Sequence, residues 1–365
     1  MLQRLLLIVL TAVLLLPASV QADQVDDDLQ TSWEVLWDQR GSPRPLIRWL
    51  KSPMPIRYRI FGTDFERHKN QIHQALQAAA QASGLVFQDV SSHADAQTAQ
   101  LDLEVVGDKA LEDNLPCYTQ PLKWSGGYFD KVLVRMRNKD TWRCVFHEMM
   151  HAMGVVGHPS GKTVLSYFPY RRDQLLPLDK TMLQAVYAQD MPRNATPLQA
   201  IQILSRYIVQ QESLGLSPDE AQQRREKFLQ TILASMEKFA QGDGEVPVIV
   251  RRSGRASEAN ITDAKREMAF YLGVAYLLGS IAPRDEITAT QWFTRSALAD
   301  YPPGQVMAGR AYYYGRGTTE DKTQGLRWLI KASAAGSAQA RDELVQIEKA
   351  LPAEDWTKLR EAATP

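Results

Sequence analysis

The sequence is poor in cysteine, has no excess of charge of either sign, and contains only one long apolar run. Its 365 residues include 42 basic and 42 acidic side chains, so the formal net charge is zero and nothing favours a nucleic-acid partner. The two cysteines, Cys117 and Cys144, allow at most one disulfide. No segment after the N-terminal run is apolar enough to cross a bilayer. The length and composition fit a globular protein of two or three domains.

The single apolar run lies at the N-terminus and has the features of a secretory signal. Arg4 precedes an apolar stretch from Leu5 to Leu16, and Val20-Gln21-Ala22 forms a small-x-small cleavage site. The stretch is too short for a comfortable transmembrane helix. We therefore expect cleavage after Ala22 and a mature protein that is periplasmic or secreted. An oxidising compartment permits a disulfide between the two cysteines, and two free thiols are the alternative.

The strongest chemical signal is the segment HEMMHAMGVVGH, residues 147–158. On a helix, His147 and His151 lie one turn apart on the same face, where two imidazoles can occupy two corners of a zinc tetrahedron. Glu148 then lies beside the metal without binding it, and its carboxylate can accept a proton from zinc-bound water. Gly154 can adopt positive φ and end the helix. His158 follows and offers a third imidazole, the alternative being a surface histidine in a loop.

This segment resembles the H-E-x-x-H-x-x-G-x-x-H signature of the metzincin zinc peptidases. His158 lies one residue beyond the third histidine of that pattern, and we expect the flexible Gly157 to absorb the extra residue. Residues 163–167, TVLSY, resemble the metzincin Met-turn, with Leu165 in the place of the methionine. In some metzincins a tyrosine at the position of Tyr167 is a further ligand or an oxyanion stabiliser.

The resemblance implies an α+β catalytic domain in which helices back a twisted sheet and an edge strand lies above the cleft. It also implies one Zn²⁺ bound by His147, His151 and His158, with Glu148 as the general base. The apolar patterns predict helices and strands in the same order. Strands are expected over 56–60, 85–87, 101–106 and 131–136, helices over 64–83 and 179–188, and an aromatic-rich loop over 118–128.

The C-terminal part contains an internal repeat with a period of 36 residues. Shifting the chain by that period places Ala275-Tyr276 on Ala311-Tyr312 and Trp292 on Trp328 without a gap. The pattern resembles Sel-type repeats, which are relatives of the tetratricopeptide repeat and form stacked helix pairs. The resemblance implies a concave face that binds a protein partner, and a stabilising cap on the first domain is the alternative.

These patterns predict five segments. They are a signal peptide over 1–22, a metzincin-like domain over 23–195, a helical connector over 196–256, Sel-type repeats over 257–350 and a tail over 351–365. The leading hypothesis is an exported zinc metallopeptidase that hydrolyses peptides or proteins and docks a protein partner on its repeats.

The alternative hypothesis is a catalytically inactive scaffold that acts through its repeats. Four features resemble an exported bacterial family of unknown function, namely Arg143-Cys144, Glu148, residues 166–168 and Leu178-Asp179. Many members of that family lack the full set of histidines, which favours the inactive scaffold. The missing methionine at Leu165 and the displaced His158 favour it as well.

Overall fold

The computed structural model describes residues 18–38, 41–112, 115–166, 173–247, 251 and 258–364. Tyr167 and the apolar run of the expected signal lie outside the described residues. Helix α1 (Ala18–Glu34) begins before the expected cleavage point, which therefore falls within this helix. In the part of the chain that is described, no helix is both long enough and apolar enough to span a membrane.

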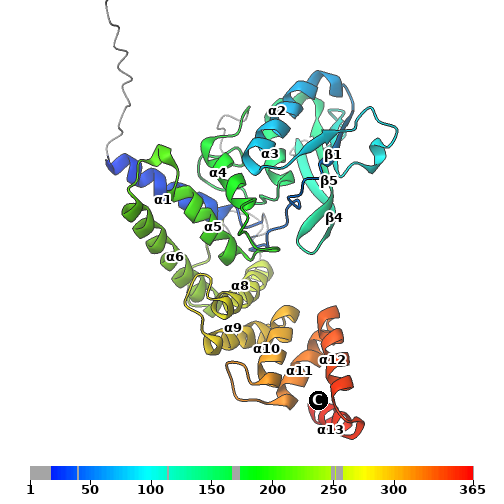
Figure 1. Ribbon diagram of the computed structural model, residues 1–365, viewed down its shortest axis with the longest axis vertical. Coiled ribbons are helices and arrows are strands. Elements are labelled where there is room, and N and C mark those ends of the chain that lie inside the picture. The colour runs from blue at the N-terminus through cyan, green and yellow to red at the C-terminus, as the bar shows by residue number, and fades with distance from the viewer. Residues whose placement is uncertain are drawn as a thin grey trace, which may run out of the picture.

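A five-stranded mixed sheet forms the upper part of the molecule in Figure 1. Its strands are β1 (Ile56–Gly62), β2 (Phe87–Asp89), β3 (Leu101–Val106), β4 (Cys117–Ser125) and β5 (Tyr128–Arg137). The spatial order is β2-β1-β3-β5-β4, in which all neighbours are parallel except the antiparallel pair of β5 with β4. The expected strands over 56–60, 101–106 and 131–136 are confirmed, and β2 lies two residues later than expected.

Helices α2 (Phe65–Ser83) and α3 (Thr141–Ala152) pack against each other beside this sheet (Figure 1). Ile72, Leu76 and Ala79 of α2 are buried, which confirms the helix expected from their three- and four-residue spacing. Short 3₁₀ turns, η1 (Ala96–Thr98) and η2 (Asn138–Asp140), precede β3 and α3. The sheet and α2 thereby hold α3, the helix that carries the histidine motif.

The expected loop over residues 118–128 is wrong, because most of it is the edge strand β4. This strand is exposed over most of its length, so its side chains lack the alternation of buried and exposed positions that indicates a strand. It also contains Pro121, which an edge strand tolerates because one of its sides has no partner. Gly126 and Gly127, with φ of 54° and 83°, form the tight turn into β5.

A second group of helices follows the sheet, and most of its members pack against α1. These are α4 (Pro177–Val186), α5 (Pro197–Val209), α6 (Pro218–Gln241) and the 3₁₀ turn η3 (Glu212–Leu214). Helix α1 lies beside α5 and α6 (Figure 1), and Trp37 just after it packs edge-on against Phe239 of α6. One continuous cluster of buried side chains runs from Val25 to Trp292 and joins these helices to the sheet.

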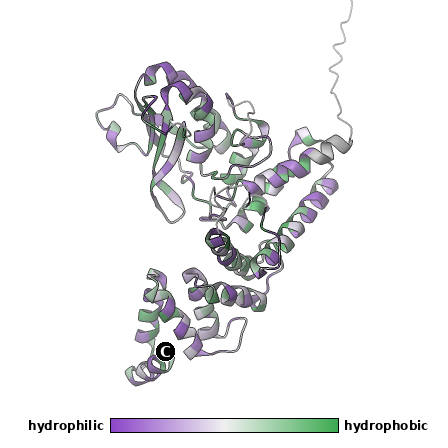
Figure 2. Cartoon of the chain, turned by 180° about the vertical axis from the view of Figure 1, so that it is seen from behind, coloured by the Kyte–Doolittle hydropathy of each residue, from purple (hydrophilic) through white to green (hydrophobic). Residues whose placement is uncertain are grey.

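The remaining helices form an arm that extends away from the sheet (Figure 1). They are α8 (Glu258–Leu278), α9 (Glu286–Leu298), α10 (Pro302–Tyr314), α11 (Lys322–Ala334), α12 (Ala338–Ala350) and α13 (Ala353–Ala363). Asp285 and Asp321, one repeat period apart, cap the N-termini of α9 and α11 with their side chains. Most helices carry both hydrophilic and hydrophobic residues (Figure 2), as amphipathic packing requires.

Candidate metal centre

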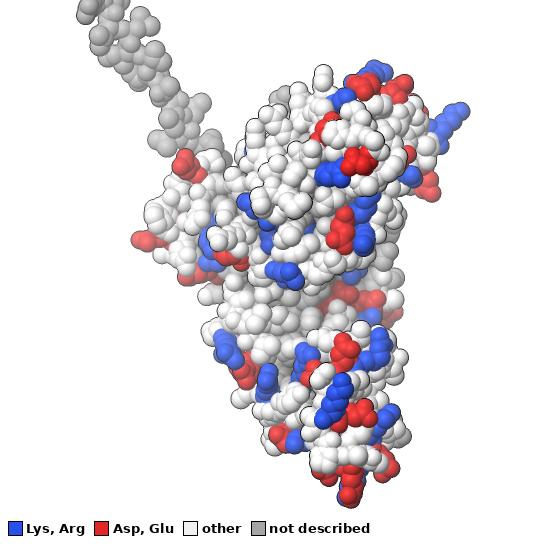
Figure 3. Space-filling model, turned by 45° about the vertical axis from the view of Figure 1, so that its right-hand side comes forward, with Lys and Arg blue, Asp and Glu red and all other residues white. Residues whose placement is uncertain are grey.

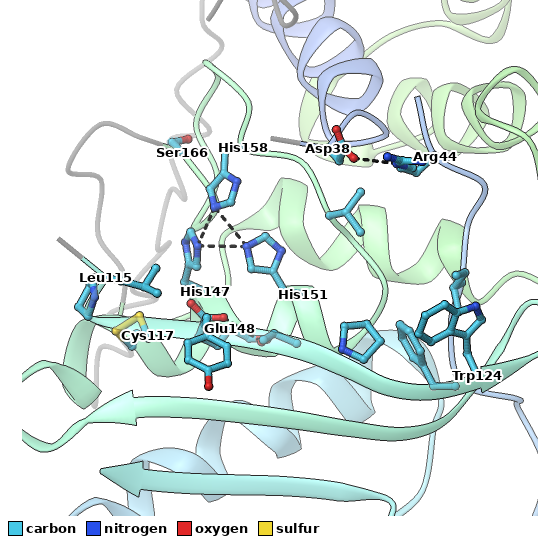
Figure 4. A pocket seen from close by; sticks show the side chains of 18 of the residues that line it. Asp38, Arg44, Leu115, Cys117, Trp124, His147, Glu148, His151, His158 and Ser166 are labelled. Atoms are coloured by element: carbon cyan, nitrogen blue, oxygen red, sulfur yellow. Dashed lines mark hydrogen bonds and ion pairs between the residues drawn. A yellow bond between two sulfur atoms is a disulfide. The ribbon is translucent and has the colours of Figure 1, made fainter. Parts of the chain in front are cut away.

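Three histidine side chains converge in the structure. The Nε2 atom of His147 lies 3.0 Å from that of His158 and 3.2 Å from that of His151, and the distance between His151 and His158 is also 3.2 Å. Figure 4 shows the three rings pointing toward a common point. They are the one group of three or more histidine, cysteine or acidic side chains in the described chain whose ligand atoms are close enough to share a metal ion.

Helix α3 places the first two histidines on one face, and a turn after it brings the third back. The turn is a Schellman motif, in which the Gly154 amide donates to the His151 carbonyl at 2.9 Å and the Val155 amide to the Met150 carbonyl at 3.1 Å. Gly154 has φ of 96°, as the sequence predicts for the residue that ends this helix. A Cβ there would lie 2.3 Å from the Ile47 carbonyl oxygen. Both the positive φ and this close approach therefore require a glycine at position 154.

The loop that carries His158 rests on the residues that follow helix α1. The Gly157 amide donates to the Val35 carbonyl at 2.9 Å, and the backbone amide and hydroxyl of Ser160 donate to Glu34 Oε2 at 2.7 and 2.8 Å. Gly157 does not have positive φ, and its backbone passes so close to residues 34–37 that a Cβ would collide with them. The close approach of this loop to residues 34–37 therefore requires a glycine at position 157, and the expectation that Gly157 absorbs the extra residue before His158 stays a prediction.

The hydrogen bonds of the other ring nitrogens fix the protonation of two histidines. Nδ1 of His147 lies 2.9 Å from the Val164 carbonyl, and Nδ1 of His151 lies 2.6 Å from the Val155 carbonyl. A carbonyl oxygen only accepts, so both Nδ1 atoms carry the proton and both Nε2 atoms carry a lone pair in the neutral rings. Burial lowers the pKa of His151 to about 4, so this ring is neutral near pH 7.

This arrangement fits a zinc ion. Lone pairs on neighbouring Nε2 atoms repel each other unless a cation lies between them, and neutral imidazole is a standard zinc ligand. For Zn–N distances of about 2.0–2.1 Å, two ligand atoms of a tetrahedron are about 3.3 Å apart. The observed separations of 3.0 to 3.2 Å are close to that value. The backbone carbonyls that bind the Nδ1 protons also supply the outer hydrogen bonds that metal-binding histidines require.

Glu148 lies beside the histidines and is almost completely buried. Its Oε2 atom accepts a hydrogen bond of 2.8 Å from the Thr119 hydroxyl, which also lies 3.1 Å from the Glu148 backbone oxygen. Burial raises the pKa of Glu148 to about 7, and the hydrogen bond from Thr119 opposes this shift. Thr119 was missed from the sequence because it lies in the segment that was expected to be a loop.

The histidines and Glu148 line a cleft of about 910 Å³. One wall is the edge strand β4, which contributes Cys117, Tyr118, Thr119, Pro121 and Trp124. Figure 4 shows β4 running below the histidines, with Trp124 at one end of the cleft and Leu115 at the other. A disulfide between Cys117 and Cys144, with a Cα–Cα distance of 6.2 Å, joins β4 to α3. The wall of the cleft is therefore covalently tied to the helix of the histidines.

The Met-turn-like segment lies beneath the site. Leu165 is fully buried where the methionine would be, and the Val164 carbonyl receives the proton of His147 Nδ1. The Asp179 carboxylate accepts from the Val164 amide at 3.2 Å and from the Leu176 amide at 2.8 Å, so α4 fixes this turn. Tyr167, the expected oxyanion stabiliser, stays a prediction because it lies outside the described residues.

The comparisons with known proteins concern the repeats. The Sel1 repeat family matches residues 266–301 and 302–337, which confirms the prediction of Sel-type repeats with a period of 36 residues. The chain therefore contains a helical Sel1 repeat region, and such repeats are protein-interaction modules. This match does not include the histidine cluster, and no curated protein matches the sequence.

The solved structures that are similar to the chain include the following three. A Sel1 repeat protein from Oxalobacter formigenes is 25% identical, with 32% of this chain and 88% of that chain covered and a TM-score of 0.23. Helicobacter pylori cysteine rich protein B is 17% identical, with coverage of 32% and 95% and a TM-score of 0.22. A protective antigen of uropathogenic Escherichia coli with an SLR fold is 17% identical, with coverage of 47% and 34% and a TM-score of 0.23.

Proposed function

We propose that this protein is a zinc-dependent hydrolase that cleaves peptide bonds and binds a protein partner through its Sel1 repeats. The observation that carries the proposal is the convergence of the three Nε2 atoms of His147, His151 and His158 beside the buried carboxylate of Glu148. The mixed sheet with an edge strand along the cleft supports a metzincin-like fold for this part of the chain. The disulfide supports a location outside the cytoplasm.

The three histidines would hold the zinc ion, and Glu148 would move the proton. A zinc ion in such a site supplies Lewis acidity toward a carbonyl and lowers the pKa of water to about 7. Glu148 accepts a proton from the attacking water and delivers it to the leaving amine. The Thr119 hydroxyl holds one oxygen of Glu148, which leaves the other oxygen for the water. The cleft lined by β4 and the three histidines would receive an extended chain.

A second candidate function is that of a non-catalytic interaction protein. The Sel1 repeats favour it, because they are the part of the chain that belongs to a recognised family and they act in protein interaction. On this account the histidine cluster binds a structural metal ion, and the partner docks on the arm α8–α13. The comparisons support this candidate more than they support the peptidase.

Peptide cleavage by the zinc-loaded chain distinguishes the two candidates. We expect the native protein to cleave members of a mixed peptide library and Glu148→Gln to lose at least about 100-fold in rate while it retains zinc. Glu66→Gln is the matched control, because Glu66 is an exposed glutamate on α2 away from the cleft. If the native protein cleaves no more than Glu148→Gln, the peptidase proposal fails. Partner capture that is unchanged in Glu148→Gln then favours the interaction protein.

A further inference from the structure

A second pocket lies between helices α5 and α6. It has a volume of about 390 Å³, and the described residues that line it all differ from those of the cleft at the histidines. The two helices pack side by side (Figure 1), and the turn η3 that joins them contributes a further wall. Positions 218, 221, 222 and 225 of α6 line the pocket and recur at three- and four-residue spacing, so they form one stripe of that helix.

The walls of this pocket are held by contacts of their own. Leu214 of η3 is buried, and Gly215 has φ of 60°, the left-handed conformation that turns the chain toward α6. Ser217 caps α6, because its hydroxyl accepts from the Glu220 amide at 3.3 Å and the Glu220 carboxylate accepts from the Ser217 amide at 3.0 Å. The fold therefore holds the pocket open, and its volume is within the range of sites for small ligands.

Arg225 brings an unpaired positive charge to this pocket. It forms no ion pair with any residue that the structure describes, and its hydrogen bond runs from Nη2 to the Gln202 carbonyl at 3.1 Å. Its Nε atom is buried and has no hydrogen-bond partner among the described residues. Burial lowers the pKa of Arg225, and the positive charge of Arg206 lowers it more than Glu226 raises it. A guanidinium has five N–H donors, so most of those on Arg225 lack a protein acceptor.

The other charged side chains of the pocket do not balance Arg225. Arg206 lines the pocket from α5, and its Nη2 atom lies 2.7 Å from Asp190, so this cation already has a carboxylate. Glu212 also lines the pocket, but it is exposed and forms no ion pair with either arginine in the described chain. Water and salt screen such an exposed carboxylate. One positive charge therefore remains unmatched.

The charge of the whole chain does not account for anion binding at this pocket. The formal net charge is zero, and basic and acidic side chains are interspersed on the face shown in Figure 3. A broad positive field that would attract every anion is therefore absent from that face. Selectivity for an anion at this pocket has to come from Arg225 and from the shape of the walls around it.

The remaining lining residues indicate the rest of the ligand. Four of them are apolar, namely Val209, Leu216, Pro218 and Ala221. Three carry side-chain amides, namely Gln210, Gln211 and Gln222. An anion with a single charge matches one unpaired guanidinium, whereas a phosphate dianion requires a second cation. The pocket thus fits a carboxylate that is attached to an apolar group.

We propose that this pocket binds a carboxylate with an apolar side chain, and that Arg225 pairs with the carboxylate. The C-terminus of a peptide and a free organic acid share this chemistry. The carboxylate takes the N–H donors of Arg225 that lack an acceptor, and the apolar group packs against Val209 and Leu216. Neither zinc nor peptide cleavage is needed for this binding, so the inference is independent of the proposed peptidase function.

Ligand-observed NMR with the full chain and N-acetyl-leucine tests the inference, because this probe joins a carboxylate to an apolar side chain. We expect its uncharged counterpart N-acetyl-leucinamide and inorganic phosphate to bind at least about tenfold more weakly. Arg225→Gln should weaken binding of N-acetyl-leucine by a similar factor, and Arg225→Lys should retain part of the affinity. Isovalerate and a tetrapeptide that ends in leucine distinguish a free organic acid from a peptide terminus.

Arg224→Gln is the matched control, because Arg224 precedes Arg225 on α6 and pairs with Asp26 at 3.3 Å but does not line the pocket. This variant should bind N-acetyl-leucine as the native chain does. Glu212→Gln is an exposed change that removes a negative charge from the pocket, so it should tighten binding by about twofold.

Four outcomes overturn the inference. A native chain that binds no N-acetyl-leucine does so, as does equal binding of the acid and its amide. Binding that survives unchanged in Arg225→Gln belongs to another site. Phosphate that binds more tightly than N-acetyl-leucine rules out the carboxylate. The comparisons of acid, amide and phosphate use the native chain alone, so they decide even if Arg225→Gln does not fold.

Discussion

The substitution Gly157→Ala tests how the third histidine is positioned, without changing any expected metal ligand. A Cβ on Gly157 would lie 2.4 Å from the Glu34 carbonyl oxygen, 2.6 Å from Val35 Cα and 2.8 Å from the Trp37 carbonyl oxygen. The shortest of these three distances is about 1 Å below the 3.4 Å at which ordinary contacts begin. All three atoms belong to the backbone, so no side-chain rotation relieves the collision.

The loop must therefore move by several tenths of an ångström, and His158 is the next residue. Metal–ligand distances tolerate deviations of only about 0.2 Å. Changes outside the ligand set commonly weaken metal binding by about 10–100-fold, which corresponds to about 1.4–2.7 kcal/mol. We expect a loss of at least this size for Gly157→Ala. The other two histidines keep their positions on α3, so residual binding remains.

Competition with a colorimetric zinc chelator measures this loss, and thermal unfolding with and without zinc checks it independently. Gly107→Ala is the matched control, because a Cβ at Gly107 would meet nothing within 4 Å. This control is expected to bind zinc as the native protein does. Native zinc affinity in Gly157→Ala would refute the role assigned to the contact between residues 34–37 and the histidine loop.

Three further changes test other parts of the structure. Thr119→Val removes the 2.8 Å hydrogen bond to Glu148 and should lower kcat/KM by about 10–100-fold. Thr119→Ser keeps a hydroxyl and should recover the rate. Equal rates in the two variants would contradict the role of Thr119 in positioning Glu148. Reduction of the disulfide that joins Cys117 to Cys144 should lower the free energy of unfolding by about 3–4 kcal/mol in denaturant titrations, and a C117S/C144S variant should not respond to reductant. Burial raises the pKa of Glu267 to about 7, above its unfolded value of 4.5, so its protonation stabilises the fold at low pH. In unfolding titrations, the free energy of unfolding should therefore fall by roughly 3 kcal/mol as the pH rises from about 4.5 to 7. A Glu267→Gln variant with the same pH profile would refute this assignment to Glu267.

The elements with clear periodicity could be predicted from the sequence. The buried positions of α2 recur at helical spacing, and β1, β3 and β5 form near-continuous apolar or alternating runs. The repeat was visible because each helix pair buries equivalent small and aromatic residues against its neighbour. Edge strand β4 was missed because exposure on both faces removes the apolar alternation, although Gly126-Gly127 is a turn signal between two strands.

The candidate site was predictable as far as one helix and its turn determine it. The spacing of His147, Glu148 and His151 follows from helix geometry alone, and the motif also pointed to His158. Contacts between distant segments were not visible in the sequence. Examples are the hydrogen bond from Thr119 to Glu148 and the approach of Gly157 to residues 34–37, which depend on how the chain folds back on itself.

We propose that the three imidazoles of His147, His151 and His158 bind one zinc ion. Calorimetric titration of the metal-free protein with zinc tests it most directly, with His151→Ala as the comparison. We expect one zinc ion per native chain and binding at least about 100-fold weaker in His151→Ala. A native chain that takes up no zinc, or a His151→Ala variant that binds zinc equally well, would contradict it.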